Sequence, residues 1–173
     1  MIRQATFDDI AAVEAAWDEH FAYEREHGAV TVFRKGVYPT RADAEKAVRA
    51  GALYVCEQDG ELAGSAIANE TQPEEYRRIS WSSLAAPDKV MVIHLIMVRP
   101  CWQGRGIASS LITYLLELAA KRACTTVRLD TGAQNIPALS LYHKLGFQTV
   151  AGASMKVGGV IAHSGHLFLE KLL

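Results

Sequence analysis

The sequence has few cysteines, no membrane-length apolar run and no excess of either charge. Its three cysteines, Cys56, Cys101 and Cys124, are odd in number and have no CxxC spacing, so we expect reduced thiols rather than disulfides or a zinc site. No uninterrupted apolar stretch is long enough to span a membrane, and the N-terminus lacks a signal-peptide pattern. These absences predict a cytoplasmic protein that has no metal site and does not bind membranes.

Charge and composition narrow the range of functions further. The 18 basic and 19 acidic side chains leave a formal net charge of −1, which gives no reason to expect nucleic acid or an anionic membrane as a partner. Any anion-binding site must therefore be local. The 173 residues are 50% hydrophobic and 21% charged, which is ordinary for a globular protein, and no repeat or linker divides them. We expect a single domain, residues 1–173.

Turn signals and hydrophobic periodicity predict the order of helices and strands. Thr6 and Thr40 are each followed three residues later by aspartate, the spacing of a capping box at a helix start. Asp59-Gly60 is a hairpin signal, because a type I′ turn needs positive φ at both central positions. Residues 24–39 and 69–89 read as irregular. The predicted strands are 2–5, 53–56, 62–68, 90–98, 126–131, 147–151 and 165–171, and the predicted helices follow residues 6, 40, 106 and 136.

The strongest functional signal lies in residues 98–109. They join Val90–Val98, which is apolar on both faces and therefore predicted to be a central strand, to an amphipathic helix that begins near Ile107. Gly104 and Gly106 carry no Cβ, so the backbone there can approach a ligand closely. The helix N-terminus adds unpaired N–H groups and the positive end of the helix dipole. This strand–loop–helix favours a phosphate or pyrophosphate ligand.

Two known phosphate-binding loops fit this segment less well than a third. The P-loop pattern G-x-x-x-x-G-K-[ST] does not occur in the chain. Gly104-x-Gly106-x-x-Ser109 nearly matches the dinucleotide fingerprint, and Asp130 stands about where an acidic ribose ligand is expected. However, the third glycine is missing, and residues 99–103 separate the strand from the glycines, where a Rossmann turn is tight. A nicotinamide-binding protein is therefore only our third hypothesis.

Two sequence blocks match the pattern of an acyl-CoA-binding family. Gln103–Ala108 fits [RQ]-x-x-G-x-[GA], after a strand that ends Val98-x-Pro100. The second block, at the right distance downstream, fits N-x-x-A-x-x-x-Y-x-x-x-G-F with Asn135, Ala138, Tyr142, Gly146 and Phe147. Together and in this order, they resemble the GNAT superfamily of acetyl-CoA-dependent N-acetyltransferases. The resemblance implies an α/β (α+β) fold with a central mixed, mostly antiparallel sheet, a splayed edge at the acyl-CoA site and about four flanking helices.

The resemblance also implies where acetyl-CoA, the one cofactor we expect, would bind. Loop amides would hold its pyrophosphate at the helix N-terminus, and the strand backbone would pair with its pantetheine arm, which Asn135 would also hydrogen-bond. Tyr142 would lie near the thioester sulfur and protonate the leaving thiolate. The implied cofactor-binding residues are Met97, Val98, Gln103, Gly104, Arg105, Gly106, Ile107, Ala108, Ser109, Asn135 and Tyr142.

The residues leave the general base open. His94 is the only ionisable side chain in Val90–Val98, and its unperturbed pKa of about 6.5 suits proton transfer, so it is our second catalytic candidate. The alternative is a neutral histidine buried and hydrogen-bonded in the sheet. Many family members have a carboxylate near the start of this strand, where this chain has Val90 and Val92. Glu70 or an ordered water could therefore serve instead.

Other reactive side chains carry less weight. Asp130 is expected to be structural, and Cys101 and Cys124 have no apparent activating partner. Glu74-Glu75 reads as a pair of solvated loop charges that could attract a cationic amine. The acceptor stays open among a small amine, an amino acid, a peptide N-terminus and a protein lysine.

We therefore expect an enzyme that transfers the acetyl group of acetyl-CoA to a primary amine, which attacks the thioester directly. The alternative, from a different class, is a non-catalytic acyl-CoA-binding sensor or interaction module. The expected partner is a small-molecule or peptide amine, with no nucleic acid or membrane, and the resemblance allows a homodimer.

Overall fold

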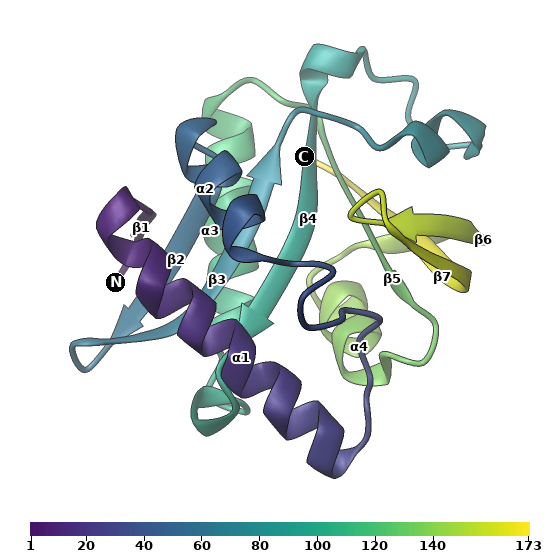
Figure 1. The fold of residues 1–173 in the computed structure, drawn as a ribbon. Helices are drawn as coiled ribbons and strands as arrows, with labels where there is room; N and C mark the ends of the chain where they lie inside the picture. Colours follow the sequence, from purple (N-terminus) through teal and green to yellow (C-terminus); the bar gives the residue numbers. More distant parts are fainter.

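Seven strands form one sheet in the computed structural model, which describes residues 1–173 (Figure 1). The strand order is β1-β2-β3-β4-β5-β7-β6, and β4–β5 is the one parallel pair. The predicted mixed, mostly antiparallel sheet is thus confirmed. The strands are β1 (Ile2–Gln4), β2 (Leu53–Gln58), β3 (Glu61–Asn69), β4 (Val90–Val98), β5 (Thr126–Gly132), β6 (Gln148–Val157) and β7 (Ile161–Leu172). The helices are α1 (Ile10–His27), α2 (Arg41–Arg49), α3 (Ile107–Lys121) and α4 (Ile136–Lys144), with short 3₁₀ turns η1 (Phe7–Asp9), η2 (Glu74–Arg78), η3 (Pro87–Lys89) and η4 (Pro100–Trp102).

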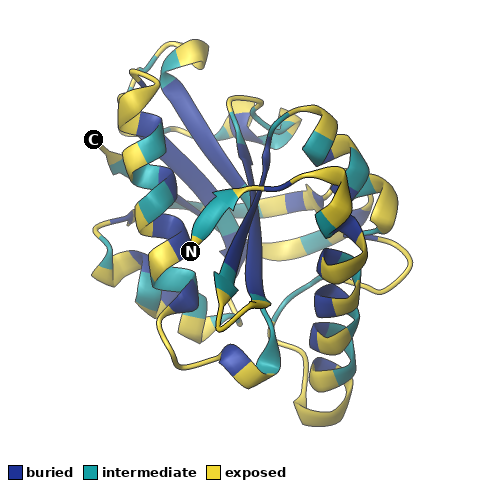
Figure 2. Ribbon diagram, turned by 90° about the vertical axis from the view of Figure 1, so that its left-hand side faces the viewer, coloured by how far each residue is buried: buried dark blue, intermediate teal, exposed yellow.

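The four helices cover the two faces of the sheet. α1 and α2 pack on one face in a buried cluster that includes Trp17 and Leu95. α3 and α4 pack on the other face, where Leu115 and Tyr142 lie in one cluster with Met91. Figure 2 shows buried central strands between helices whose outer faces are exposed. No helix is both long and apolar enough to cross a membrane.

The local signals in the sequence form as predicted. Capping boxes begin the first two helical segments at Thr6 and Thr40. Asp59 and Gly60 both have positive φ, 53° and 82°, and connect β2 to β3. Each of these signals depends only on residues close together in the sequence, so helix starts and hairpin turns can be predicted from it without knowledge of the rest of the fold.

One helix end was predicted wrongly. The irregular stretch was expected to start at residue 24, but α1 continues to His27. Glu24 is buried, and its Oε1 accepts hydrogen bonds from the backbone N–H groups of Val30 and Thr31, at 3.0 and 2.8 Å. The carboxylate therefore satisfies the backbone of the segment after the helix. Glu24 belongs to the inner face of α1, although its charge is typical of a solvated position.

β4 and β5 lie side by side over only part of their length. Val90–Ile93 pairs with Thr126–Leu129, and beyond these residues the strands separate. β4 goes on to Val98 paired with β3 alone, and β5 goes on to Gly132 paired with β7 alone. The sheet opening between residues 94–98 and 130–132 is the predicted splayed edge. Its strand backbone has no strand partner on the facing sides.

The last hairpin is longer than predicted. β6 and β7 run over Gln148–Val157 and Ile161–Leu172, whereas residues 147–151 and 165–171 were expected. Two irregularities in the β6–β7 register break the alternation that would have indicated the longer strands. The tip of the hairpin reaches the segment before α2, where a Cβ on Gly158 would lie 2.3 Å from Cγ of Tyr38. Glycine at 158 therefore allows this contact.

Candidate active site

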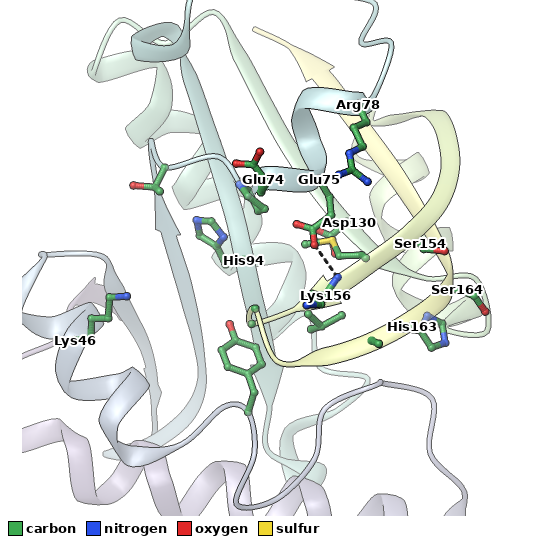
Figure 3. Close-up of a pocket in the computed structure, with 18 residues that line it drawn as sticks. Lys46, Glu74, Glu75, Arg78, His94, Asp130, Ser154, Lys156, His163 and Ser164 are labelled. Atoms are coloured by element: carbon green, nitrogen blue, oxygen red, sulfur yellow. Dashed lines mark hydrogen bonds between the residues drawn. The ribbon is translucent and has the colours of Figure 1, made fainter.

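Three cavities meet at the sheet opening. The glycine-loop cavity, about 480 Å³, lies between the end of β4, the loop of residues 103–106, α3 and α4. The hairpin cavity, about 1060 Å³, lies between η2, β4 and the β6–β7 hairpin (Figure 3). A small central cavity joins them, because it shares Asn135 and Tyr142 with the first and His94 and Asp130 with the second. The arrangement makes a continuous path through the sheet opening.

The glycine loop is shaped by its backbone. Gly104 and Gly106 have φ of +73° and +80°, values that L side chains rarely adopt. Gly106 is the residue before α3, so the first N–H groups of that helix face the cavity mouth. Trp102 anchors the loop in the core, and the Arg105 guanidinium lies over its ring at 4.8 Å. The loop can therefore hold an anionic group on backbone donors.

The structure brings most of the predicted cofactor residues to one cavity. Met97 and Arg105 do not line it, because Met97 packs in the core beneath α1 and Arg105 stacks on Trp102. Asn135 is the N-cap of α4, and its Oδ1 accepts from the N–H of Ala138 at 3.3 Å. The predicted residues that do line the glycine-loop cavity are Val98, Gln103, Gly104, Gly106, Ile107, Ala108, Ser109, Asn135 and Tyr142.

Tyr142 lies where the glycine-loop and central cavities meet. The residue is 9% exposed, its ring packs against Phe147, and its hydroxyl has no hydrogen bond within the protein. Burial, with the nearby Asp130 carboxyl second, raises the pKa of Tyr142 well above its usual value. The phenol therefore stays protonated over the physiological range and can donate a hydrogen bond or a proton to a ligand at this junction.

His94 reaches the opening from β4. Its Nε2 lies 2.8 Å from Oδ1 of Asn69, and since that oxygen only accepts, Nε2 carries the proton and Nδ1 is the unprotonated nitrogen. Burial lowers the pKa of His94 to about 4, so the ring is neutral at physiological pH. His94 is thus both buried and hydrogen-bonded in the sheet and part of the cavity wall.

Asp130 faces His94 from the other side of the opening. It lies on β5, its side chain is 11% exposed, and its Oδ1 accepts a 2.8 Å hydrogen bond from the Tyr76 hydroxyl. Burial raises the pKa of Asp130 to about 7; the Tyr76 hydrogen bond acts against this rise, and Glu75 adds to it. A carboxyl with this pKa can accept a proton near neutral pH. From the sequence, we expected a structural residue at this position.

The other candidates for acid–base or metal chemistry lie elsewhere. Glu70 is bound to Arg122 at 2.9 Å and lines none of the three cavities. Cys56 and Cys124 are buried, which raises the pKa of both thiols, and Cys101 is exposed. None of them lines the cavities. No cluster of three or more His, Cys, Asp or Glu side chains could hold a metal ion.

The hairpin cavity has a polar, mixed-charge wall. Figure 3 shows Glu74, Glu75 and Arg78 on one side of it and Lys46 across from them. Glu75 Oε1 accepts from the backbone N–H of Lys156 at 3.0 Å, which ties η2 to β6. The Glu74-Glu75 pair, expected to be solvated, therefore borders the site. This wall can receive a polar ligand with its reacting group against Asp130 and His94.

Comparison with known proteins gives one consistent result. A family model described as Acetyltransferase (GNAT) family matches residues 11–147. An uncharacterized N-acetyltransferase of Methanocaldococcus jannaschii is 34% identical over 96 residues, 56% of this chain and 38% of that protein. The streptothricin acetyltransferase of Escherichia coli is 29% identical over 146 residues, 83% of this chain and 72% of that protein. The chain thus spans well under half of the first relative and most of the second.

Solved structures share the fold. A GNAT-family acetyltransferase of Streptococcus agalactiae 2603 has a TM-score of 0.81 against this chain, with 23% identity, over 100% of this chain and 95% of the other. The shared architecture includes the sheet and helices that frame the three cavities.

Proposed function

Because this chain belongs to the GNAT family of acetyltransferases, we propose that it transfers the acetyl group of acetyl-CoA to a primary amine, by direct attack of the amine on the thioester. The observation that carries this proposal is the meeting of the cavities at the sheet opening. Tyr142 lies on the glycine-loop side of the junction and Asp130 on the hairpin side, so a donor and an acceptor can meet between an acid and a base.

Acetyl-CoA would occupy the glycine-loop cavity. The N–H groups of residues 103–108 would hold its pyrophosphate at the start of α3. Its pantetheine arm would lie in the sheet opening against the β4 backbone near Met97 and Val98, where no strand partner competes. Asn135 lines the same cavity, and its side-chain NH₂ would donate to the arm. The thioester then comes to lie beside Tyr142.

This binding mode predicts a specific effect of Gly106→Ala. No atom lies within 4 Å of the added Cβ, so the substitution acts through the backbone, where a positive φ costs about 1–2 kcal/mol with an L side chain. We expect that loss in the free energy of unfolding and, because the loop relaxes, weaker acetyl-CoA binding. Gly60→Ala is the matched control. Gly60 also has a positive φ, +82°, and no atom lies within 4 Å of its added Cβ, but it lies in the β2–β3 turn, away from the glycine loop. Calorimetric titration should show weaker binding for Gly106→Ala alone; equal affinities would contradict the assignment.

The acceptor amine would enter through the hairpin cavity and must lose its proton. A lysine-like amine of pKa about 10.4 is neutral in about one molecule in two thousand at pH 7, which adds about 4–5 kcal/mol to the barrier, whereas an α-amino group of pKa about 7.7–8.0 adds about 1 kcal/mol. Asp130 would take this proton. Neutral His94 would accept a hydrogen bond from the amine through Nδ1 and orient its lone pair.

The bond changes follow from these positions. The ammonium proton first passes through the Asp130 carboxylate to solvent, which leaves the amine neutral and Asp130 ionised again. The amine lone pair then attacks the thioester carbonyl carbon, and the nitrogen of the tetrahedral intermediate gives its second proton to Asp130. As the tetrahedral intermediate collapses, the C–S bond breaks and the Tyr142 hydroxyl gives its proton to the departing sulfur, so that the amide and the CoA thiol are released. Solvent then restores the proton of Tyr142 and removes that of Asp130.

A free-thiol assay with acetyl-CoA and a panel of amines tests the proposed function. The panel should hold small amines, amino acids, peptides with free N-termini and peptides with internal lysines, with acetyl-CoA hydrolysis in the absence of amine as the control. We expect thiol release that depends on at least one amine, together with acetyl-CoA binding in a calorimetric titration. Binding without release across the whole panel would contradict the proposal and favour an acyl-CoA sensor, and binding of NAD but not CoA would exclude both.

A further inference from the structure

Two histidines of β7 lie beside Asp130: His166 lines the central cavity, and His163 lines the hairpin cavity. In the β5–β7 register Asp130 lies opposite Phe168, and His166 lies two residues before Phe168 on β7, so the side chains of Asp130 and His166 are diagonal neighbours on one face. Nε2 of His166 is 3.4 Å from Oδ2 of Asp130. Nδ1 of His166 is 2.8 Å from Nδ1 of His163, which lines the hairpin cavity on the side away from His94 (Figure 3). The three side chains form a line from the reaction centre to the cavity rim.

The chemistry of the atoms fixes the protons along this line. His166 is 2% exposed, and burial, with His163 second, lowers its pKa to about 4, so its ring is neutral and carries one N–H. Ionised Asp130 only accepts, so the arrangement without repulsion places that N–H on Nε2, the ring nitrogen that lies near Oδ2. Nδ1 of His166 is then an acceptor, and His163 must supply the proton of the 2.8 Å contact from its own Nδ1. One tautomer of each ring satisfies both contacts.

We propose that the His163–His166 pair is a positioning device for the catalytic base: His163 fixes the tautomer of His166, and His166 donates to Oδ2 of Asp130, so that the carboxylate is oriented toward the amine and favoured in its ionised, proton-accepting form. The inference rests on the proposed function. Tyr76 donates to Oδ1 at 2.8 Å, and Nε2 of His166, 3.4 Å from Oδ2, is the nearest nitrogen that could serve the second oxygen. Hydrogen bonds to the charged form of a carboxyl lower its pKa, so the pair opposes the effect of burial.

Several titratable groups surround Asp130, and they set the expected direction of the change. The hairpin cavity also holds Lys46, Glu74, Arg78, Lys156 and His163, which are unchanged in His166→Leu. Tyr76 donates to it, Glu75 repels its charge, and neutral His94 adds no charge. Two further tyrosines with raised pKa values stay uncharged near it. Removal of the His166 donor alone should therefore raise the pKa of Asp130. The groups are Tyr76 and Glu75 from η2, His94 from β4, Tyr142 from α4, Tyr38 from the segment before α2, and His166 from β7.

The test compares pH profiles of kcat/KM. His166→Leu removes the donor, and we expect the rising acid limb to move about one pH unit upward, so that kcat/KM falls about tenfold at pH 6 and hardly changes at pH 9. His166→Gln, which keeps an N–H, should restore part of the shift, and His163→Leu should cause a smaller one. His143→Leu is the matched control, because His143 is exposed on α4 and bonds only Thr149. An equal loss at every pH in His166→Leu would overturn the proposal.

A second measurement needs no activity. The carboxyl carbon-13 resonance of Asp130 is assigned by its absence in Asp130→Asn. We would follow the pH titration of this resonance in the wild-type protein, in His166→Gln and in His163→Leu. The two variants keep the test available if His166→Leu does not fold. We expect the Asp130 midpoint to be higher in both variants than in the wild type. Unchanged midpoints would overturn the inference even in an active enzyme. If the wild type transfers no acetyl group, the proposed function fails, while this titration still decides whether the histidine pair acts on Asp130.

Discussion

Replacement of Tyr142 by phenylalanine should lower kcat about 10²–10⁴-fold and leave the acetyl-CoA dissociation constant within a few-fold of wild type. The ring packs against Phe147 in both proteins, so the shape of the junction is kept. The lost hydroxyl has no hydrogen bond within the protein, so its removal leaves no buried group without a partner. What is lost is proton donation to the departing sulfur, and general acid catalysis contributes a factor of this size.

Two measurements on the same preparation separate the effect of the Tyr142 hydroxyl on turnover from its effect on acetyl-CoA binding. Thiol release gives kcat, and calorimetric titration with acetyl-CoA gives the dissociation constant. Thermal unfolding in the absence of ligand should be nearly the same in both proteins and is the control for folding. A proportional loss of binding and turnover would mean that Tyr142 only holds the donor, and an unchanged kcat would remove it from the mechanism.

Asp130→Asn should cause the other large effect. Since the pKa of Asp130 is about 7, wild-type kcat/KM should rise with pH through this value as the carboxyl ionises. The asparagine variant cannot accept the proton at any pH, so we expect kcat/KM to fall about 10²–10⁴-fold and the limb near pH 7 to disappear. A pH profile from 5 to 9 with an α-amino acceptor checks both, with kcat/KM expressed per neutral amine because the acceptor itself ionises at about 7.7–8.0. A variant that keeps the limb would show that another group is the base.

The same substitution should stabilise the protein at alkaline pH. The folded-state pKa of Asp130 lies above its unfolded value of about 3.9, so the folded chain binds more protons between these values. The contribution of Asp130 to stability is therefore fully present below about pH 4 and is lost as pH rises through about 7. Asparagine does not ionise. Chemical unfolding at pH 8 should show Asp130→Asn to be more stable than wild type, the opposite of its effect on activity.

The lining of the glycine-loop cavity, where we propose that the donor binds, could be predicted from the sequence because its residues are contiguous. The loop of residues 103–108 needs only two glycines and the start of a helix, and the Asn135–Phe147 block lies on one turn and one helix. In both, the spacing of the residues along the chain is also their spacing in the site. The capping boxes at Thr6 and Thr40 were predictable for the same reason.

The acceptor half could not be predicted, because it depends on register between strands far apart in the sequence. His94 and Asp130 face each other only because β4 and β5 pair up to residues 93 and 129 and then separate. His166 reaches Asp130 through the β5–β7 register, and the wall at Tyr38 depends on an unpredicted extension of the last hairpin to Gly158. Residue types indicated His94 as a candidate base but not its position opposite Asp130, and Asp130 was read as structural.

The opening between β4 and β5 has a consequence for the lifetime of the folded chain. Residues 94–98 lie in the middle of the sheet yet have no strand partner on one side, so we expect their amides to exchange with solvent faster than those of residues 90–93. A ligand that hydrogen-bonds along this edge binds the native state alone and raises the free energy of unfolding by about 2.7 kcal/mol at one hundred times its dissociation constant. In the proposed binding mode, acetyl-CoA would act as a removable strand, and its concentration would govern how long the enzyme stays folded as well as how fast it turns over.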